Sequence, residues 1–100
     1  MKKIINGRLY NTETAELIAS HDNGYFANDF HYCSEDLYRK KNGEFFLYGE
    51  GGGLSKYAEP YGNGWGYGEI ITPLSVDEAK KWMEKNCDAD TYLSFFDAEE

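Results

Sequence analysis

The stretch LYRKKNGEFFLY, residues 37–48, decides the fold, because two runs containing apolar residues flank the dipeptide Asn42-Gly43. Asn-Gly is typical of a two-residue type I′ turn, which requires positive φ at both central positions. We therefore expect an antiparallel hairpin centred on this dipeptide.

Such a turn fixes which residues of the two strands face each other. It pairs Tyr38 with Leu47 and Leu37 with Tyr48. Tyr38 and Leu47 then share one face of the hairpin, and Leu37 and Tyr48 share the other. Both faces carry apolar side chains, so we expect one face to pack on the core and the other to be covered in part by the glycine-rich segment or by a partner.

Upstream of the hairpin, residues 3–10 predict a smaller hairpin that turns at Asn6-Gly7. A side chain at Asn11 or Thr12 can then cap a helix, which we predict over residues 12–20.

Downstream, a strand is expected over residues 67–72, after which Pro73 has no amide to donate. Ser75 and Glu78 form a capping box, so we predict the main helix from Ser75 to Asn86. A last short helix, capped by Asp88 or Asp90, follows.

One hundred residues make a single domain, residues 1–100. The fold class that we expect is α+β: an antiparallel sheet of three to five strands packed on one main helix, with short N- and C-terminal helices. Aromatic residues make up 17% of the chain, so rings are expected to supply much of the core.

Residues 45–69 combine many glycines with aromatic side chains. Neither Walker A nor a dinucleotide fingerprint fits, because Leu54-Ser55-Lys56 follows Gly53. Stacking on single-stranded nucleic acid is the second interpretation, but Lys56 is the one base in this stretch, and such grooves are normally cationic. The plainest interpretation is that the glycines allow turns and close approach while the rings fold back on the core.

His31 and Cys33 are the one candidate nucleophilic pair, since strand positions i and i+2 share a face. No spacing resembles a metal site. We expect Cys33 to be half-buried and the histidines to face solvent, and we predict no enzyme activity, cofactor or metal. Cys33 and Cys87 lie far apart without an export signal, which favours reduced thiols and a cytoplasmic location with no membrane segment.

The net charge of −8 argues against general binding to phosphate backbones. Residues 88–100 hold five acids and no base. These carboxylates are either a solvated surface or a patch that meets a cationic groove on a partner protein.

Three segments carry a family resemblance: MKKIINGRLYNTETAE, LYRKKNGEFFLYGEGGGLSKYAE and IITPLSVDEAKKWME. They resemble a family of small acidic proteins of Gram-positive bacteria and their mobile genetic elements, and the likeness covers most of the chain. Some relatives in that family are anti-CRISPR proteins that act on type II effectors. The resemblance implies stoichiometric binding to a Cas9-type effector, and it supplies no catalytic position.

The sequence therefore predicts an acidic protein-binding antagonist, most concretely an anti-CRISPR inhibitor, whose partner presents a cationic nucleic-acid-binding surface. The alternative is a module for single-stranded nucleic acid. The predicted partner-binding residues are Tyr57, Tyr61, Trp65, Tyr67, Asp88, Asp90 and Asp97.

Overall fold

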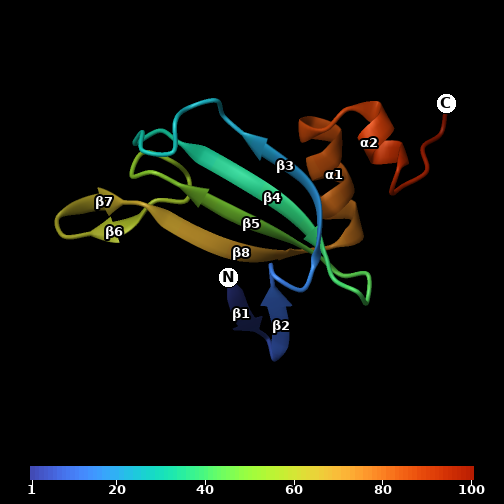
Figure 1. Ribbon diagram of the computed structural model, residues 1–100, viewed down its shortest axis with the longest axis horizontal. Coiled ribbons are helices and arrows are strands. Elements are labelled where there is room, and N and C mark those ends of the chain that lie inside the picture. Colours follow the sequence, from blue (N-terminus) through green and yellow to red (C-terminus); the bar gives the residue numbers. More distant parts are fainter.

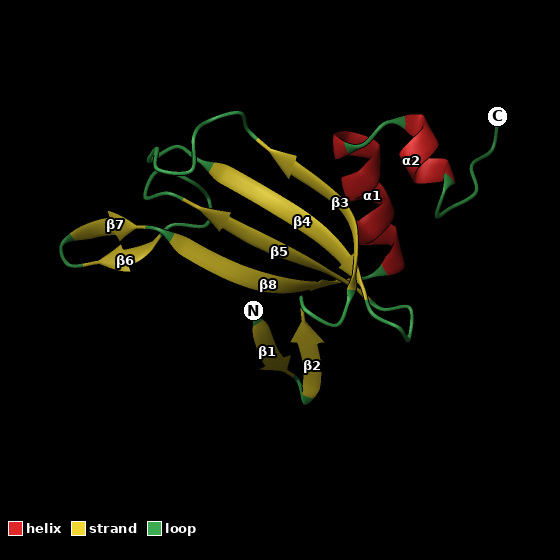
Figure 2. Ribbon diagram, viewed as in Figure 1, coloured by secondary structure: helices red, strands yellow, loops and turns green.

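A computed structural model describes all residues, 1–100, and shows an α+β fold (Figure 2). The strands are β1 (Lys2–Ile5), β2 (Arg8–Asn11), β3 (Glu16–Asp22), β4 (Cys33–Arg39), β5 (Phe45–Gly51), β6 (Glu59–Tyr61), β7 (Gly64–Gly66) and β8 (Gly68–Leu74). The helices are α1 (Val76–Asn86) and α2 (Ala89–Leu93).

The centre of the molecule is one antiparallel sheet with the order β3-β4-β5-β8. Two further hairpins, β1–β2 and β6–β7, form separate two-stranded sheets. Figure 1 shows β6–β7 at one end of the long axis and α1, α2 and the C-terminus at the other. The molecule is elongated, with extents of 49 × 33 × 20 Å.

The predicted hairpin forms, but its predicted register is wrong by one residue. Leu37 faces Leu47 and Tyr38 faces Phe46. The turn is longer than expected. The amide of Gly43 donates to the carbonyl of Lys40, and the amide of Lys40 donates to the carbonyl of Glu44. Three residues thus form the loop, and Gly43 takes the positive φ of 90° that ends it.

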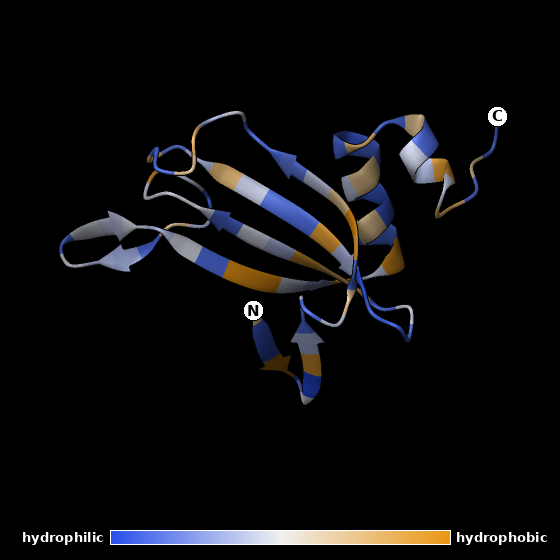
Figure 3. Ribbon diagram, in the orientation of Figure 1, coloured by the Kyte–Doolittle hydropathy of each residue, from blue (hydrophilic) through white to orange (hydrophobic).

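This register places Leu37, Phe45 and Leu47 on the same side of the sheet, where they form a buried cluster with Ala79 and Met83 of α1. Figure 3 shows the hydrophobic bands of α1 among hydrophilic ones. The expected boundaries of α1 are confirmed. Its start at Ser75 is fixed by the predicted capping box, with the Glu78 amide 3.1 Å from the Ser75 hydroxyl.

The opposite side of the sheet is covered by the β1–β2 hairpin. Phe46 is fully buried there with Tyr10 of β2 and Ile71 of β8. The Tyr10 ring meets Phe46 edge-on at 5.5 Å, and the Tyr38 ring stacks on Phe46 at 5.2 Å. The hairpin itself turns at Asn6-Gly7 as predicted, with φ of 52° and 76°.

The N-terminal helix predicted over residues 12–20 is wrong, because Glu16–Asp22 form edge strand β3. The Asn11 side chain accepts from the amide of Glu13 and so supports a turn instead of a helix start. Pairing of β3 with β4 then satisfies the backbone of this segment, and this tertiary pairing outweighs helix propensity.

The strand predicted over residues 67–72 continues past its predicted end. β8 includes Pro73, which faces Phe46. A proline is tolerated here because β8 is an edge strand with one free side. The predicted C-terminal helix is confirmed as α2, with Asp88 as its N-cap.

Gly49 illustrates why the middle of the chain is rich in glycine. A β-carbon at Gly49 would lie 2.0 Å from Cζ of the Tyr57 ring, whereas one at Gly64 would meet nothing within 4 Å. We expect Gly49→Ala to lower the free energy of unfolding by about 1–3 kcal/mol through overpacking. Gly64→Ala is the matched control and is expected to change it by less than about 0.5 kcal/mol. Urea unfolding of both variants measures this, and equal stabilities would contradict the close approach of the Tyr57 ring.

Candidate functional site

Three connections meet at the end of the molecule that carries β6–β7 (Figure 1): residues 23–32, residues 52–58 and the β6–β7 hairpin. The amide of Leu54 donates to the carbonyl of Phe30 at 2.8 Å, and that of Gly52 donates to Tyr32 at 2.9 Å. Gly53 lies so close to the Trp65 carbonyl that a β-carbon would be 2.6 Å away. The three connections therefore support one another.

The β3–β4 connection is fixed by side chains as well as by backbone. Asn23 donates to the carbonyl of His31 at 2.7 Å and accepts from the amide of Cys33 at 3.1 Å. Asp29 accepts from the amide of His31 at 2.8 Å. Local side-chain bonds of this kind hold a loop in one conformation, so Phe26 and Phe30 are displayed on an ordered loop.

Exposed aromatic side chains gather at this end. Tyr61 is 80% exposed, Trp65 65% and Phe26 84%. We call the following set the aromatic end: Tyr25, Phe26, Phe30, Leu54, Tyr61, Trp65 and Tyr67. All six exposed aromatic residues of the chain belong to it. Exposed apolar groups that cluster in this way mark interaction sites, whereas single ones need no explanation.

Tyr57, a predicted partner-binding residue, has a structural role instead of an exposed one. Its ring packs over Gly49, and its hydroxyl donates to the carboxylate of Glu35. The Trp82 indole of α1 donates to Glu35 at 3.2 Å, and the ammonium of Lys56 lies 2.9 Å from it. Tyr57 thus connects the glycine-rich segment to the sheet and to α1.

The Glu35 carboxylate is charged although the residue is only 8% exposed. Burial would raise the pKa of Glu35, but the hydrogen-bond donors around it, Tyr57 first among them, outweigh burial and hold this pKa below its usual value. Burial and the bond to Glu35 raise the pKa of Tyr57, so its hydroxyl remains a donor. No buried side-chain nitrogen or oxygen in this network lacks a hydrogen-bond partner.

Tyr67 is about half exposed, and a hydrogen bond holds its hydroxyl in place. Its hydroxyl donates to the carboxylate of Glu50, and the hydroxyl of Tyr48 donates to Glu69 on the neighbouring strand. Burial, followed by these bonds to carboxylates, raises the pKa of both tyrosines. Tyr67 therefore ties the base of the β6–β7 hairpin to the sheet.

The charge at the aromatic end is negative. Lys56 is the only one of the ten basic residues in its three connections, and its ammonium is paired with Glu35. The acidic residues in these connections or within three residues of them are Asp22, Asp29, Glu35, Glu50, Glu59 and Glu69. A partner surface that docks here without repulsion must be neutral or cationic.

The predicted acidic residues Asp88, Asp90 and Asp97 do not adjoin the predicted aromatic residues. Asp88 caps α2 by accepting from the amide of Thr91 at 2.9 Å. Figure 1 places α2 and the C-terminal residues at the opposite end of the 49 Å long axis from β6–β7. The two predicted groups therefore form two separate surfaces.

His31 and Cys33 are the candidate nucleophilic pair of the sequence, and the structure shows the expected half-buried Cys33 and exposed His31. The His31 ring bonds to Asp29 at 3.2 Å and stacks on Tyr25 at 5.3 Å, and no hydrogen bond joins it to Cys33. Burial raises the pKa of the Cys33 thiol, which lowers its thiolate fraction and its reactivity. Both cysteines are free, and no group of three metal-ligating side chains gathers anywhere. Neither helix is long and apolar enough to span a membrane.

Sequence reasoning missed Tyr25, Phe26, Phe30 and Leu54 as members of the aromatic end. The signal available was the aromatic, irregular stretch at residues 25–32, which has no strand or helix period. Only tertiary contacts place this stretch beside the β6–β7 hairpin: Leu54 bonds to Phe30, and Gly53 next to it lies close to Trp65 of the hairpin.

Comparisons with protein-family models, with curated proteins and with solved structures found no match for this chain.

Proposed function

We propose that the protein is a protein-binding antagonist that docks through its aromatic end onto a cationic surface of a partner protein. One observation carries the proposal: five of the six exposed aromatic side chains lie on three mutually supported connections at one end, and the sixth, Tyr67, directly follows the β6–β7 hairpin. Tyr and Trp are the residues most enriched among the energetic anchors of interfaces. Anchors on fixed loops lose little conformational entropy on binding, which favours affinity.

The negative charge of the aromatic end favours a cationic partner surface. The family resemblance of the sequence names a concrete candidate, a Cas9-type effector, whose heteroduplex channel is positively charged. On this proposal the protein inhibits by occupying such a channel stoichiometrically, without catalysis and in the cytoplasm. Cas9 is therefore the first partner to test.

The experiment is a pull-down with the purified protein as bait and Cas9 with or without guide RNA as prey, at low and moderate salt. We expect a complex that weakens with salt, because complementary charge contributes to it. Capture of guide-free Cas9 alone would indicate that the guide and the protein compete for one surface. Failure with both Cas9 forms would remove the anti-CRISPR assignment.

The aromatic end is tested by Trp65→Ala and Tyr61→Ala. An anchor residue contributes about 2 kcal/mol or more, so each variant is expected to bind about 30-fold more weakly. Leu17→Ala and Val76→Ala are controls, because both residues are half exposed but lie away from this end. Titration calorimetry gives the affinities, and thermal unfolding shows whether the variants fold. Folded Trp65 and Tyr61 variants with unchanged affinity would contradict the docking surface.

The alternative, a module for single-stranded nucleic acid, is favoured by the same exposed rings, on which bases can stack. The pairing of Lys56 with Glu35 weighs against it, because no free base remains in the three connections. Fluorescence anisotropy with a labelled oligonucleotide separates the two functions. Salt-sensitive binding of the oligonucleotide would favour the nucleic-acid-binding module and count against the antagonist.

A further inference from the structure

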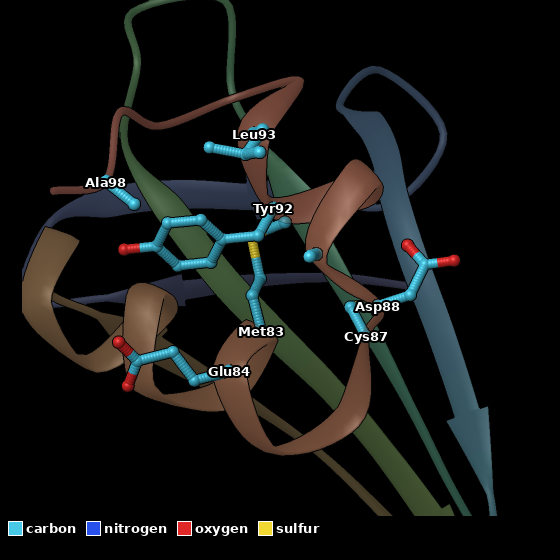
Figure 4. Close-up of a pocket in the computed structure, with 8 residues that line it drawn as sticks. Met83, Glu84, Cys87, Asp88, Tyr92, Leu93 and Ala98 are labelled. Atoms are coloured by element: carbon cyan, nitrogen blue, oxygen red, sulfur yellow. The ribbon is translucent and has the colours of Figure 1, made fainter. Parts of the chain in front are cut away.

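A pocket of about 340 Å³ lies between α1, α2 and the C-terminal residues, at the opposite end from the aromatic end (Figure 4). Met83 and Cys87 of the α1 side line it together with Tyr92 and Leu93 of α2. Its lining is mainly hydrophobic. The volume is at the small end of the range for ligand sites, enough for one large apolar group.

The pocket is formed by residues that are themselves fixed. Met83 is fully buried in the core cluster of the sheet. The Tyr92 ring packs against Phe96 at 5.6 Å, and Phe96 in turn packs against Phe45 of β5 at 5.6 Å. α2 is thereby held against the sheet, so the pocket exists before any occupant arrives.

The two charged residues that line the pocket are both acidic. Figure 4 shows Glu84 and Asp88 on either side of Met83 and Tyr92. Beyond the pocket, Asp90 and Asp97 continue the negative charge, and residues 88–100 contain no base. α1 carries three lysines, Lys80, Lys81 and Lys85, and none of them lines the pocket; the ammonium of Lys80 lies over the Phe96 ring at 5.2 Å.

We propose that this pocket, the C-terminal pocket, binds one large apolar side chain of a cationic peptide segment, with the flanking lysines or arginines of that segment facing Glu84 and Asp88. The apolar lining and the small volume require a single apolar anchor. Carboxylates on both sides of the anchor, continued by those of the C-terminal residues, favour several positive charges over one. A short stretch of a basic protein has this chemistry, and a monovalent amine has only part of it.

The chain offers a direct readout, because its only two methionines are Met1 and Met83. Protein labelled with ¹³C at the methionine methyl groups is titrated with the peptide Ac-Lys-Lys-Trp-Lys-Lys-amide. We expect a saturable shift of the Met83 methyl signal, while the Met1 signal stays in place as the internal control. The peptide Ac-Glu-Glu-Trp-Glu-Glu-amide tests the charge, and Ac-Lys-Lys-Ala-Lys-Lys-amide tests the anchor. Neither is expected to shift Met83.

Two variants place the binding in the pocket. Ala89→Phe fills the space beside Tyr92, since Ala89 lines the pocket and is exposed, and it is expected to abolish the Met83 shift without unfolding. Glu84→Gln is expected to weaken binding about twofold to fivefold, the range for an exposed ion pair. Glu13→Gln changes the net charge equally but lies outside the pocket, so it should bind like the natural protein.

Several results would overturn the proposal. Equal Met83 shifts with the acidic and basic tryptophan peptides would contradict the preference for a cationic occupant. Tryptamine binding as tightly as the basic peptide would show that a single amine suffices and that no peptide segment is needed. Tight binding of the alanine peptide would show that surface charge alone drives binding and that no apolar side chain enters the pocket. Unchanged binding by folded Ala89→Phe protein would place the site elsewhere. None of these results bears on the aromatic end, which lies at the far end of the molecule.

Discussion

Replacing Phe46 by alanine is expected to lower the free energy of unfolding by about 3–5 kcal/mol, the usual cost of removing a fully buried ring. Phe46 has no exposed surface and contacts the rings of Tyr10 and Tyr38. The loss includes more than one side chain, because Tyr10 attaches the β1–β2 hairpin to the sheet through this ring. The total free energy of unfolding of a domain of this size is only about 5–15 kcal/mol.

Urea unfolding followed by circular dichroism measures the effect, and Phe26→Ala is the matched control. Phe26 undergoes the same chemical change but is 84% exposed, so its stability should move by less than about 0.5 kcal/mol. Phe46→Leu keeps most of the volume and should remain folded even if Phe46→Ala does not. Similar losses for Phe46→Ala and Phe26→Ala would contradict the burial of Phe46 in the cluster with Tyr10 and Ile71.

Replacing Glu35 by alanine is expected to lower the free energy of unfolding by about 2–4 kcal/mol. The change leaves the Tyr57 hydroxyl and the Trp82 indole without their acceptor, and each unsatisfied donor costs about 1–3 kcal/mol. The ammonium of Lys56 adds little, because that side chain is 63% exposed and returns to solvent. Thermal or urea unfolding gives the number. A loss below about 0.5 kcal/mol would contradict the network.

The same network gives stability a pH dependence with a definite sign. The folded pKa of Glu35 lies below its usual value of 4.5, so its contribution is complete above that pH and is lost as the pH falls through the folded pKa. Glu35→Gln removes this titration but leaves the exposed carboxylates. We expect the natural protein to lose more stability than Glu35→Gln between about pH 5 and pH 3. Parallel profiles would show that Glu35 does not titrate in this way.

The elements that the sequence predicts correctly are those with a local physical signal. The Ser75–Glu78 capping box and the Asp88 cap place both helices, because the capping bonds join residues three apart. Asn6-Gly7 places the first hairpin because it alone among its neighbours suits positive φ. These signals need no knowledge of the rest of the chain.

The failures arise where distant residues decide the outcome. Residues 16–22 become a strand because β4 is there to pair with, and nothing local in ELIASHD shows this partner. The register of the main hairpin depends on one residue of loop length, and Asn42-Gly43 is compatible with both a two-residue and a three-residue turn. One residue of shift exchanges the two faces of a strand.

The candidate site was predictable in part for the same reason. Tyr61 and Trp65 are exposed on the hairpin, so the interpretation that the rings of this glycine-rich stretch fold back on the core is wrong for them and holds for Tyr57. Tyr57 could not be separated from them, because its contact with Glu35 joins residues 22 apart in sequence. The distance between the aromatic end and the acids of α2 likewise follows from the sheet, which lies between them (Figure 1).

Both free edges of the sheet have features that oppose lengthening by a further strand. In β3 the register shifts between Leu17 and Ala19, so the backbone there is not a regular template. In β8 Pro73 lacks the amide that an incoming strand would need. Amyloid-like stacking and strand addition from another chain are therefore disfavoured even though the sheet is open.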